Sequence, residues 1–261
     1  MSSCSTYLAQ AILNHVLRGQ YYTPPAGIYL ALGLADFTAN NVTANEVSAA
    51  WYARQQITSF EAPTGSGMST SNSNALQFSA VTGSAVSVSH WGLYDASTSG
   101  NLLAYGEFTS PRIANVNNVV KVAAGSLEIT FSGMFSVHLA QALINRVFRG
   151  QAFATPTPYL ALYTTDPTIS DAGSEVSADW YAREAISSWA APAGTGRETS
   201  NLAAFDFAEV AVADVTVTHW GLRDAATTGN LLFFKAFDDS QALNIGDVFA
   251  GSVGDLVVNV N

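Results

Sequence analysis

The chain has 261 residues, a length that fits one large domain or two ordinary ones at roughly 100–200 residues per domain. Hydrophobic residues make up 48% and charged residues only 11%, yet no apolar run approaches the ~20 residues of a membrane-spanning helix. Ten Lys and Arg against twenty Asp and Glu give a net charge of −10. The composition is therefore not that of a disordered protein or of a membrane-spanning protein. The negative net charge argues against binding to nucleic acid or to an anionic membrane surface.

The first predicted element is an amphipathic helix that opens the chain. Leu8, Ile12 and Val16 recur at helical spacing, Ser5 is available as the N-cap, and Gly19 supplies a C-terminal stop. This segment lacks the positive start and unbroken apolar stretch of a secretory signal. The single cysteine cannot form an internal disulfide, so we expect synthesis and folding in a reducing cytoplasm.

Short strands are predicted along the rest of the first half. They are rich in β-branched and aromatic residues and are separated by clusters of Gly, Pro, Ser, Thr and Asn. The pattern includes IYLALGL, RQQITSF, ALQFSAV, VSVSHWGLY, NLLAYGEF and SLEITF. Some six or seven strands in about 130 residues predict an antiparallel β-sandwich, with the helix covering an edge or one face.

The same series of elements then occurs a second time. LAQAILNHVLRGQ at 8–20 returns as LAQALINRVFRGQ at 139–151, and EVSAAWYAR at 46–54 returns as EVSADWYAR at 175–183. HWGLYDASTSGNLL at 90–103 returns as HWGLRDAATTGNLL. We therefore predict a mainly β protein of two tandem antiparallel β-sandwich domains, each preceded by an N-terminal α-helix. A repeat this long also predicts that each copy has a core of its own.

The predicted domains are 1–132 and 133–261. Up to Ser132 there are six acidic and four basic residues, a net charge of −2, whereas from Gly133 onward there are fourteen acidic and six basic, a net charge of −8. The two surfaces have diverged while turns and core positions persist. Different surroundings for the two halves in an assembly would explain the asymmetry, as would neutral drift of solvated faces.

One candidate site repeats a Glu, a Tyr and an Arg at fixed spacing, which could bind a polar ligand. In a chain with so few charges, we favour a structural role, with each Arg paired to a carboxylate: Glu46 or Asp95 in the first copy, and Glu175 or Asp224 in the second. Such a pair would hold a loop in place. The repeated residues are Glu46, Tyr52, Arg54, Glu175, Tyr181 and Arg183.

A second candidate site is the repeated His-Trp pair, which stands five residues before an Asp. A His with an orienting carboxylate could act as a general base. We instead interpret the indole as a core anchor and the Asp as the first residue of a tight turn. The residues are His90, Trp91 and Asp95, and His219, Trp220 and Asp224.

The sequence shows no motif for metal binding, phosphate binding or nucleophilic catalysis. The four His, one Cys and scattered carboxylates show no short-spaced ligand pairs, and TGSGMST and AGTGRET are turns rather than phosphate-binding loops. No nucleophile has a recognisable context. We therefore predict no catalytic residues, no metal, no cofactor and no enzymatic activity.

The order of blocks resembles a virion structural module of tailed bacteriophages, often labelled a tail fibre or head decoration protein. Copy two carries the resemblance most fully, through PYLALYTTDPTISDAGSEVSADWYAR and VTHWGLRDAATTGNLLF. Copy one departs from the pattern at LALGLADFTANNVTANEVS. The resemblance implies a non-enzymatic virion component with a β-sandwich fold, made in the bacterial host cytoplasm and bound to other virion proteins.

Two positions in the particle are then open. A capsid decoration (cement) protein would contact the major capsid protein and stabilise the head, and a trimer of a duplicated module would present pseudo-sixfold symmetry. A tail or tail-fibre component would instead contact tail proteins, with one copy docked and the other exposed. We favour decoration, because the chain has no coiled coil or shaft repeat. A carbohydrate-binding module that uses the repeated Trp residues as stacking platforms is the alternative from another class.

Overall fold

A computed structural model describes residues 3–260, and in it the chain is mainly β with two helices. The first copy contains β1 (Ser3–Cys4), α1 (Thr6–Leu17), β2 (Ile28–Gly33), a 3-10 turn (Thr43–Asn45), β3 (Gln55–Ile57), β4 (Ser69–Ser71), β5 (Leu76–Ala80), β6 (Val86–Tyr94), β7 (Leu102–Ala114), β8 (Val119–Val122) and β9 (Glu128–Thr130). The second contains α2 (Val137–Arg149), β10 (Tyr159–Tyr163), β11 (Glu184–Ala185), β12 (Glu198–Ser200), β13 (Phe205–Asp206), β14 (Val215–Arg223), β15 (Leu231–Leu243), β16 (Ala250–Gly251) and β17 (Val257–Asn259). No helix among residues 3–260 has the length and apolar character to cross a bilayer.

Both helices begin and end as predicted. The Ser5 hydroxyl accepts a hydrogen bond from the Leu8 amide at 3.1 Å, and the Ser136 hydroxyl accepts one from Leu139 at the same distance. These bonds satisfy an amide that the first helical turn leaves free. Gly19 and Gly150 end the helices, and each has φ of 65°, a left-handed conformation that glycine adopts without steric cost.

Each copy builds one main antiparallel sheet. In the first copy its order is β1-β7-β6-β2-β3, and in the second it is β11-β10-β14-β15. Smaller two-stranded sheets accompany it, namely β5-β8 and β4-β9 in the first copy and β13-β16 and β12-β17 in the second. The prediction of a mainly β, antiparallel fold in tandem, with a helix at the start of each copy, is confirmed.

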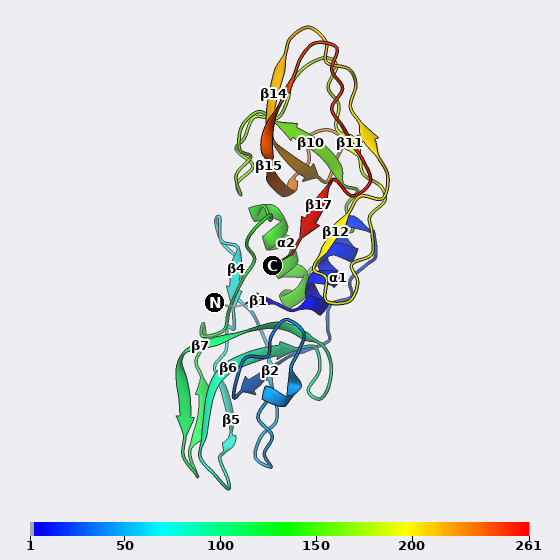
Figure 1. Ribbon diagram of the computed structural model, residues 1–261. Helices are drawn as coiled ribbons and strands as arrows, with labels where there is room; N and C mark the ends of the chain where they lie inside the picture. The colour runs from blue at the N-terminus through cyan, green and yellow to red at the C-terminus, as the bar shows by residue number, and fades with distance from the viewer. Residues whose placement is uncertain (1–2, 261) are drawn as a thin grey trace.

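The helices lie between the two copies, at the middle of the molecule (Figure 1). Gln10 of α1 donates from Nε2 to the carbonyl oxygens of Gly194 and Gly196, at 3.0 and 2.9 Å. Gln141 of α2 donates in the same way to Gly65 and Gly67, at 2.9 and 3.0 Å. Each helix is thus held by the glycine-rich turn of the other copy, and the contacts are reciprocal.

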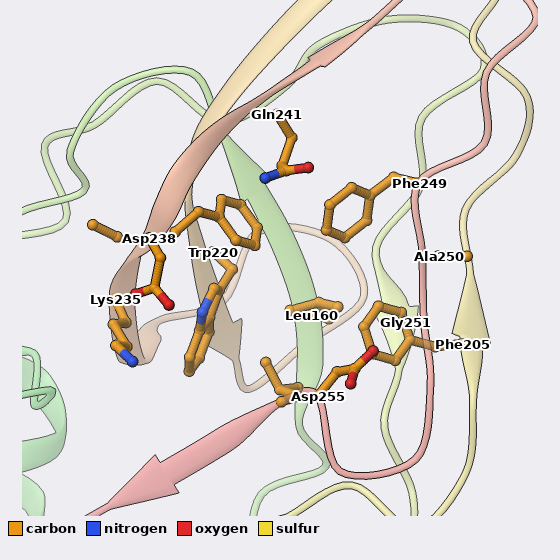
Figure 2. A pocket seen from close by; sticks show the side chains of 13 residues that line it. Leu160, Phe205, Trp220, Lys235, Asp238, Gln241, Phe249, Ala250, Gly251 and Asp255 are labelled. Atoms are coloured by element: carbon orange, nitrogen blue, oxygen red, sulfur yellow. The ribbon is translucent and has the colours of Figure 1, made fainter.

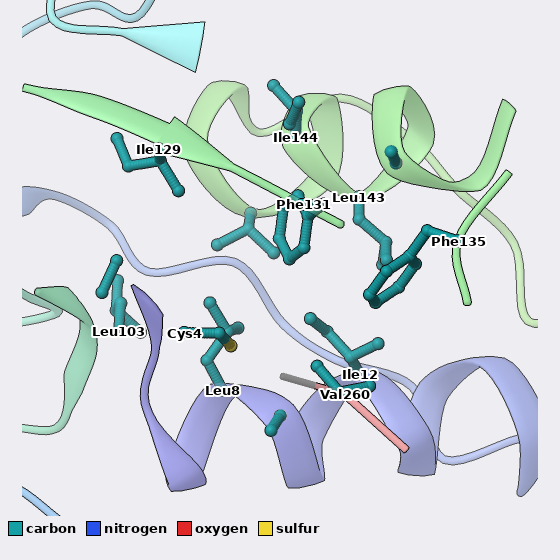
Figure 3. Packing of buried hydrophobic residues seen from close by; sticks show 14 of the residues in the cluster. Cys4, Leu8, Ile12, Leu103, Ile129, Phe131, Phe135, Leu143, Ile144 and Val260 are labelled. Atoms are coloured by element: carbon teal, nitrogen blue, oxygen red, sulfur yellow. The ribbon is translucent and has the colours of Figure 1, made fainter. Parts of the chain in front are cut away.

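Apolar side chains also make contacts between the two copies. The ring centroids of Phe60 and Phe148 lie 5.2 Å apart, and those of His15 and Phe153 lie 5.4 Å apart. Figure 3 shows Ile12 of α1 close to Val260 from the end of the second copy. One continuous buried cluster runs from Cys4 to Val260. Smaller buried clusters belong to the first copy alone and to the second copy alone, but the main cluster is shared by both copies. That each copy has a core sufficient to fold alone stays a prediction.

The main sheets extend away from this shared core in opposite directions, so the molecule is elongated, with a β lobe at each end (Figure 1). Both ends of the described chain lie near the middle. The lobe tips are therefore formed by loops within each copy, far from the helices.

Candidate functional site

The repeated Glu, Tyr and Arg side chains meet in both copies. Arg54 forms a two-pronged ion pair with Glu46, with Nε–Oε1 and Nη2–Oε2 distances of 2.8 and 2.7 Å. The Tyr52 hydroxyl donates to the same carboxylate at 2.7 Å. In the second copy, Arg183 and Tyr181 bind Glu175 at 2.7–2.9 Å. This fork geometry matches the planar guanidinium to a carboxylate.

The same arginines also hold the turn that follows the His-Trp strand. Arg54 Nη1 donates to the carbonyl oxygens of Ala96 and Ser99, at 3.1 and 2.6 Å. Its guanidinium lies over the Tyr94 ring, 3.5 Å from the centroid. The Arg54 side chain is 6% exposed. The cluster therefore fastens a loop to the main sheet, as the structural interpretation of the sequence expects.

Asp95 closes its own turn instead of pairing with Arg54. Its carboxylate accepts hydrogen bonds from the Asn101 amide nitrogen at 2.7 Å and from Asn101 Nδ2 at 2.8 Å. Asp224 binds Asn230 in the same way, at 2.6 and 2.8 Å. Of the two carboxylates considered for each Arg, the glutamate is the partner.

The electrostatics of the cluster do not suit proton transfer near neutral pH. Burial alone would raise the pKa of Glu175, but hydrogen bonds from Arg183 and Tyr181 outweigh it and hold that pKa below the usual range. Burial and the bond to Glu46 raise the pKa of Tyr52. A general base works best with a pKa near the operating pH, and these groups are shifted away from it.

The repeated histidines do not contact the aspartates that follow them. The Nδ1 atom of His90 lies 2.8 Å from Ser89 Oγ, and that of His219 lies 2.8 Å from Thr218 Oγ1. Within residues 3–260, no hydrogen bond joins His90 to Asp95 or His219 to Asp224. The predicted pairing of each histidine with the aspartate that follows it is therefore not formed. His219 Nε2 lies 3.8 Å from a different carboxylate, that of the exposed Asp166.

The indoles next to these histidines are buried. Trp91 is 2% exposed and Trp220 is 6% exposed. Trp91 packs on Gly106, where an added Cβ atom would lie 2.6 Å from the indole. Two equivalent exposed Trp platforms, which a carbohydrate-binding module would present, are therefore not available at these positions.

Sequence reasoning missed the ion pair between Arg223 and Asp171, which the first copy lacks. Arg223 binds Asp171 through two bonds of 2.8 Å and donates to the Tyr163 hydroxyl at 2.7 Å. The first copy has Tyr94 and Asn41 at the matching positions, joined by one hydrogen bond of 2.5 Å. Comparing the two copies position by position would have suggested it, because Arg and Asp replace Tyr and Asn together.

The second copy also has an aromatic pocket that was not predicted from the sequence. It encloses about 280 Å³. Figure 2 shows Trp220, Lys235 and Asp238 on one side and Phe205 and Phe249 on the other. Its remaining lining includes Leu160, Phe237, Gln241, Gly251 and Asp255. Among the residues that the structure describes, no three His, Cys, Asp or Glu side chains are grouped to hold a metal ion.

Comparison with known protein families accounts for nearly the whole chain. A family model described as Podophage GP4 fiber I protein gp80 matches residues 3–130 and again residues 134–259. The chain therefore belongs to this family, and it carries the family's module twice. No curated protein matches the chain. The resemblance to a virion structural module of tailed bacteriophages is confirmed.

Proposed function

We propose that this tandem member of the podophage fibre family is a non-enzymatic fibre component that binds other virion proteins through its first copy and projects its second. The proposal rests on the reciprocal contacts of the two helices, each of which donates hydrogen bonds to a turn of the other copy. These contacts join the two copies into one elongated unit with chemically different ends (Figure 1). In a rigid unit of this kind, the position of the free end is fixed relative to the attached end.

The charge distribution supports the choice of free end. The second copy has a net charge of −8 and the first a net charge of −2. Acidic surface keeps a protein soluble and discourages non-specific association. The nearly neutral first copy is the better surface for packing against another subunit.

Family membership favours a fibre component over the capsid decoration protein that the sequence alone favoured. Decoration of the head stays the second candidate, because a trimer of this chain would present six similar modules. The trimer itself stays a prediction, and light scattering of the purified protein tests it. The two positions differ in copy number per particle.

The first test is a count of the protein in purified particles by quantitative mass spectrometry. We expect a number on the order of ten, set by the low symmetry of a tail or its neck. Hundreds of copies per particle would instead establish decoration and overturn the fibre proposal.

The second test asks which end is free. An epitope tag is inserted after Ala213 in the second copy or, as the matched control, after Ser84 in the first; both residues lie in exposed loops. We expect antibody to label intact particles that carry the tag at Ala213 and not those that carry it at Ser84. The reverse pattern would contradict the proposed orientation.

A further inference from the structure

The aromatic pocket lies in the second copy, at a place where the two copies differ although they share one fold. Phe237 is half-buried there, whereas its counterpart Phe108 is only 4% exposed. In the first copy the Arg112 guanidinium lies over the Phe108 ring, 4.6 Å from its centroid. The residues that match Phe249 and Gly251 are Val120 and Val122, which are 2% and 0% exposed. The same Phe is thus sealed in one copy and open to solvent in the other.

Coordinated replacements open the pocket. Val122 pairs with Leu76 in the first copy, while Gly251 pairs with Phe205 in the second. A Cβ atom on Gly251 would lie 2.3 Å from the Phe205 ring, so this ring occupies space that only a glycine leaves free. The two strands β13 and β16 have two residues each, against five and four in β5 and β8. The second copy has therefore lost aliphatic packing here and gained aromatic rings.

The rings form a continuous apolar wall. The centroid of Phe249 lies 5.5 Å from that of Phe237 and 6.4 Å from that of Phe205. All three side chains are half-buried, and Trp220 lies deeper at 6% exposure. Flat ring faces that solvent can reach are suited to the apolar faces of another ring.

Polar side chains of both signs surround this wall. Lys235, Asp238 and Asp255 are exposed, and Gln241 is partly buried with its Nε2 atom bonded to the Asp239 carbonyl oxygen at 2.7 Å. Within the described part of the chain, the side chains of Lys235 and Asp238 form no ion pair or hydrogen bond. These groups offer both donors and acceptors to a ligand.

We propose that this pocket binds one pyranose ring of a glycan. A pyranose has an apolar face that stacks on aromatic rings and hydroxyl groups that need donors and acceptors around its edge. A volume of about 280 Å³ admits a single ring. Opposite charges at the rim and the net charge of −10 do not favour a nucleic acid or a strongly anionic ligand. Binding at this pocket does not depend on where the protein sits in the particle.

The experiment is saturation-transfer NMR on the full chain with a panel of methyl glucosides, galactosides and mannosides, N-acetylglucosamine, and defined trisaccharides. We expect at least one pyranose to bind with a dissociation constant on the order of 1 mM, because so small a ligand gains little free energy. A trisaccharide that contains it should bind more tightly. No transfer to any sugar at about 10 mM, ten times that constant, would overturn the proposal and leave the pocket as a contact for an apolar side chain of another protein.

Variants then locate the binding. Phe249→Val gives the second copy the residue that the first copy has at this position, and we expect it to weaken binding at least tenfold. Asp238→Ala should weaken binding about fivefold, since one hydrogen bond to a charged group contributes that much or more. The matched control is Asp239→Ala, because Asp239 is an exposed neighbour of Asp238 that does not line the pocket. Equal affinity of Phe249→Val and the parent, or equal loss in Asp239→Ala, would show that the sugar binds elsewhere.

Discussion

At the scale of single residues, the paired Glu and Arg side chains carry the clearest energetic consequence. Arg54 neutralises Glu46, whose side chain is 14% exposed, and satisfies two turn carbonyl groups. Removing one partner of a buried pair leaves the other charge without compensation. The sequence predicted this pair because charges are rare in the chain and the spacing recurs, but it left the choice between glutamate and aspartate open.

The first prediction concerns Arg54→Ala, which should lower the free energy of unfolding by about 3 kcal/mol. Urea unfolding measures it. The control Arg149→Ala removes an arginine that donates to Asn145 within the same helix, and it should cost less than about 0.5 kcal/mol. An Arg54→Ala protein that retained the parent melting temperature and oligomeric state would contradict a structural role for the pair.

The second prediction concerns Gly100, in the turn that Asp95 closes. Gly100 has φ of 74°, and an added Cβ atom would lie 2.4 Å from the Asp95 carboxylate. Gly125 has nearly the same φ, 76°, but open space around it. Gly125→Ala should therefore cost only the backbone penalty of about 1 kcal/mol, and Gly100→Ala about 2–3 kcal/mol. Equal losses in urea unfolding would mean that the turn relaxes around the new atom.

At the scale of elements, local sequence signals were sufficient to predict the helices and most strands. Ser5 and Ser136 cap the helices, and glycines end them, because these features depend on a few neighbouring residues. The position of the helices could not be predicted in the same way. Gln10 and Gly194 are 184 residues apart in sequence, and nothing in the local pattern of either residue indicates its partner.

The third prediction concerns His15 of α1, which is 1% exposed where the two copies meet. Its Nδ1 atom accepts a hydrogen bond from the Tyr22 amide at 3.2 Å. Burial, and then the nearby Arg146, lower the pKa of His15 below its ordinary value of 6.5. The unfolded chain therefore takes up a proton near pH 6.5 while the folded chain does not, so stability is complete above that pH and declines as the pH falls below it.

Thermal melts at pH 7.5 and 5.5 measure this effect. The parent should be less stable at pH 5.5, by no more than about 1.4 kcal/mol, which is the limit that one pH unit below 6.5 sets for the uptake of a single proton. His15→Gln should lose less over the same interval, whereas the control His138→Gln, at an exposed position of α2, should behave as the parent. The pKa of Glu175 is also held below its ordinary value of 4.5, so its contribution is lost at lower pH. Equal pH dependence in the His15 variant and the parent would refute the assignment.

At the scale of the whole molecule, the repeat predicted two copies but not how they are joined. Comparison of the copies shows why. Core and turn positions are under the same constraint in both, so they repeat, while the pocket and the Arg223–Asp171 pair arise where the copies differ. Identical positions therefore indicate the shared fold, whereas positions that differ indicate where the two copies present different surfaces.

The last prediction follows from the shared core. Phe131 and Phe135 are buried on either side of exposed Ser132 and Gly133, so a protease site inserted between Ser132 and Gly133 should be cleaved without disturbing either ring. The cleaved halves should stay together in size-exclusion chromatography and separate only in denaturant, because each helix packs against the other copy and donates to its turn carbonyl groups. The control is the same site inserted after Thr227, in the exposed turn of β14 and β15, where cleavage leaves the connection between the copies intact. Halves that separated into stable monomers after cleavage would show that each copy folds alone. That result would remove the physical basis for a rigid unit with one attached and one free end.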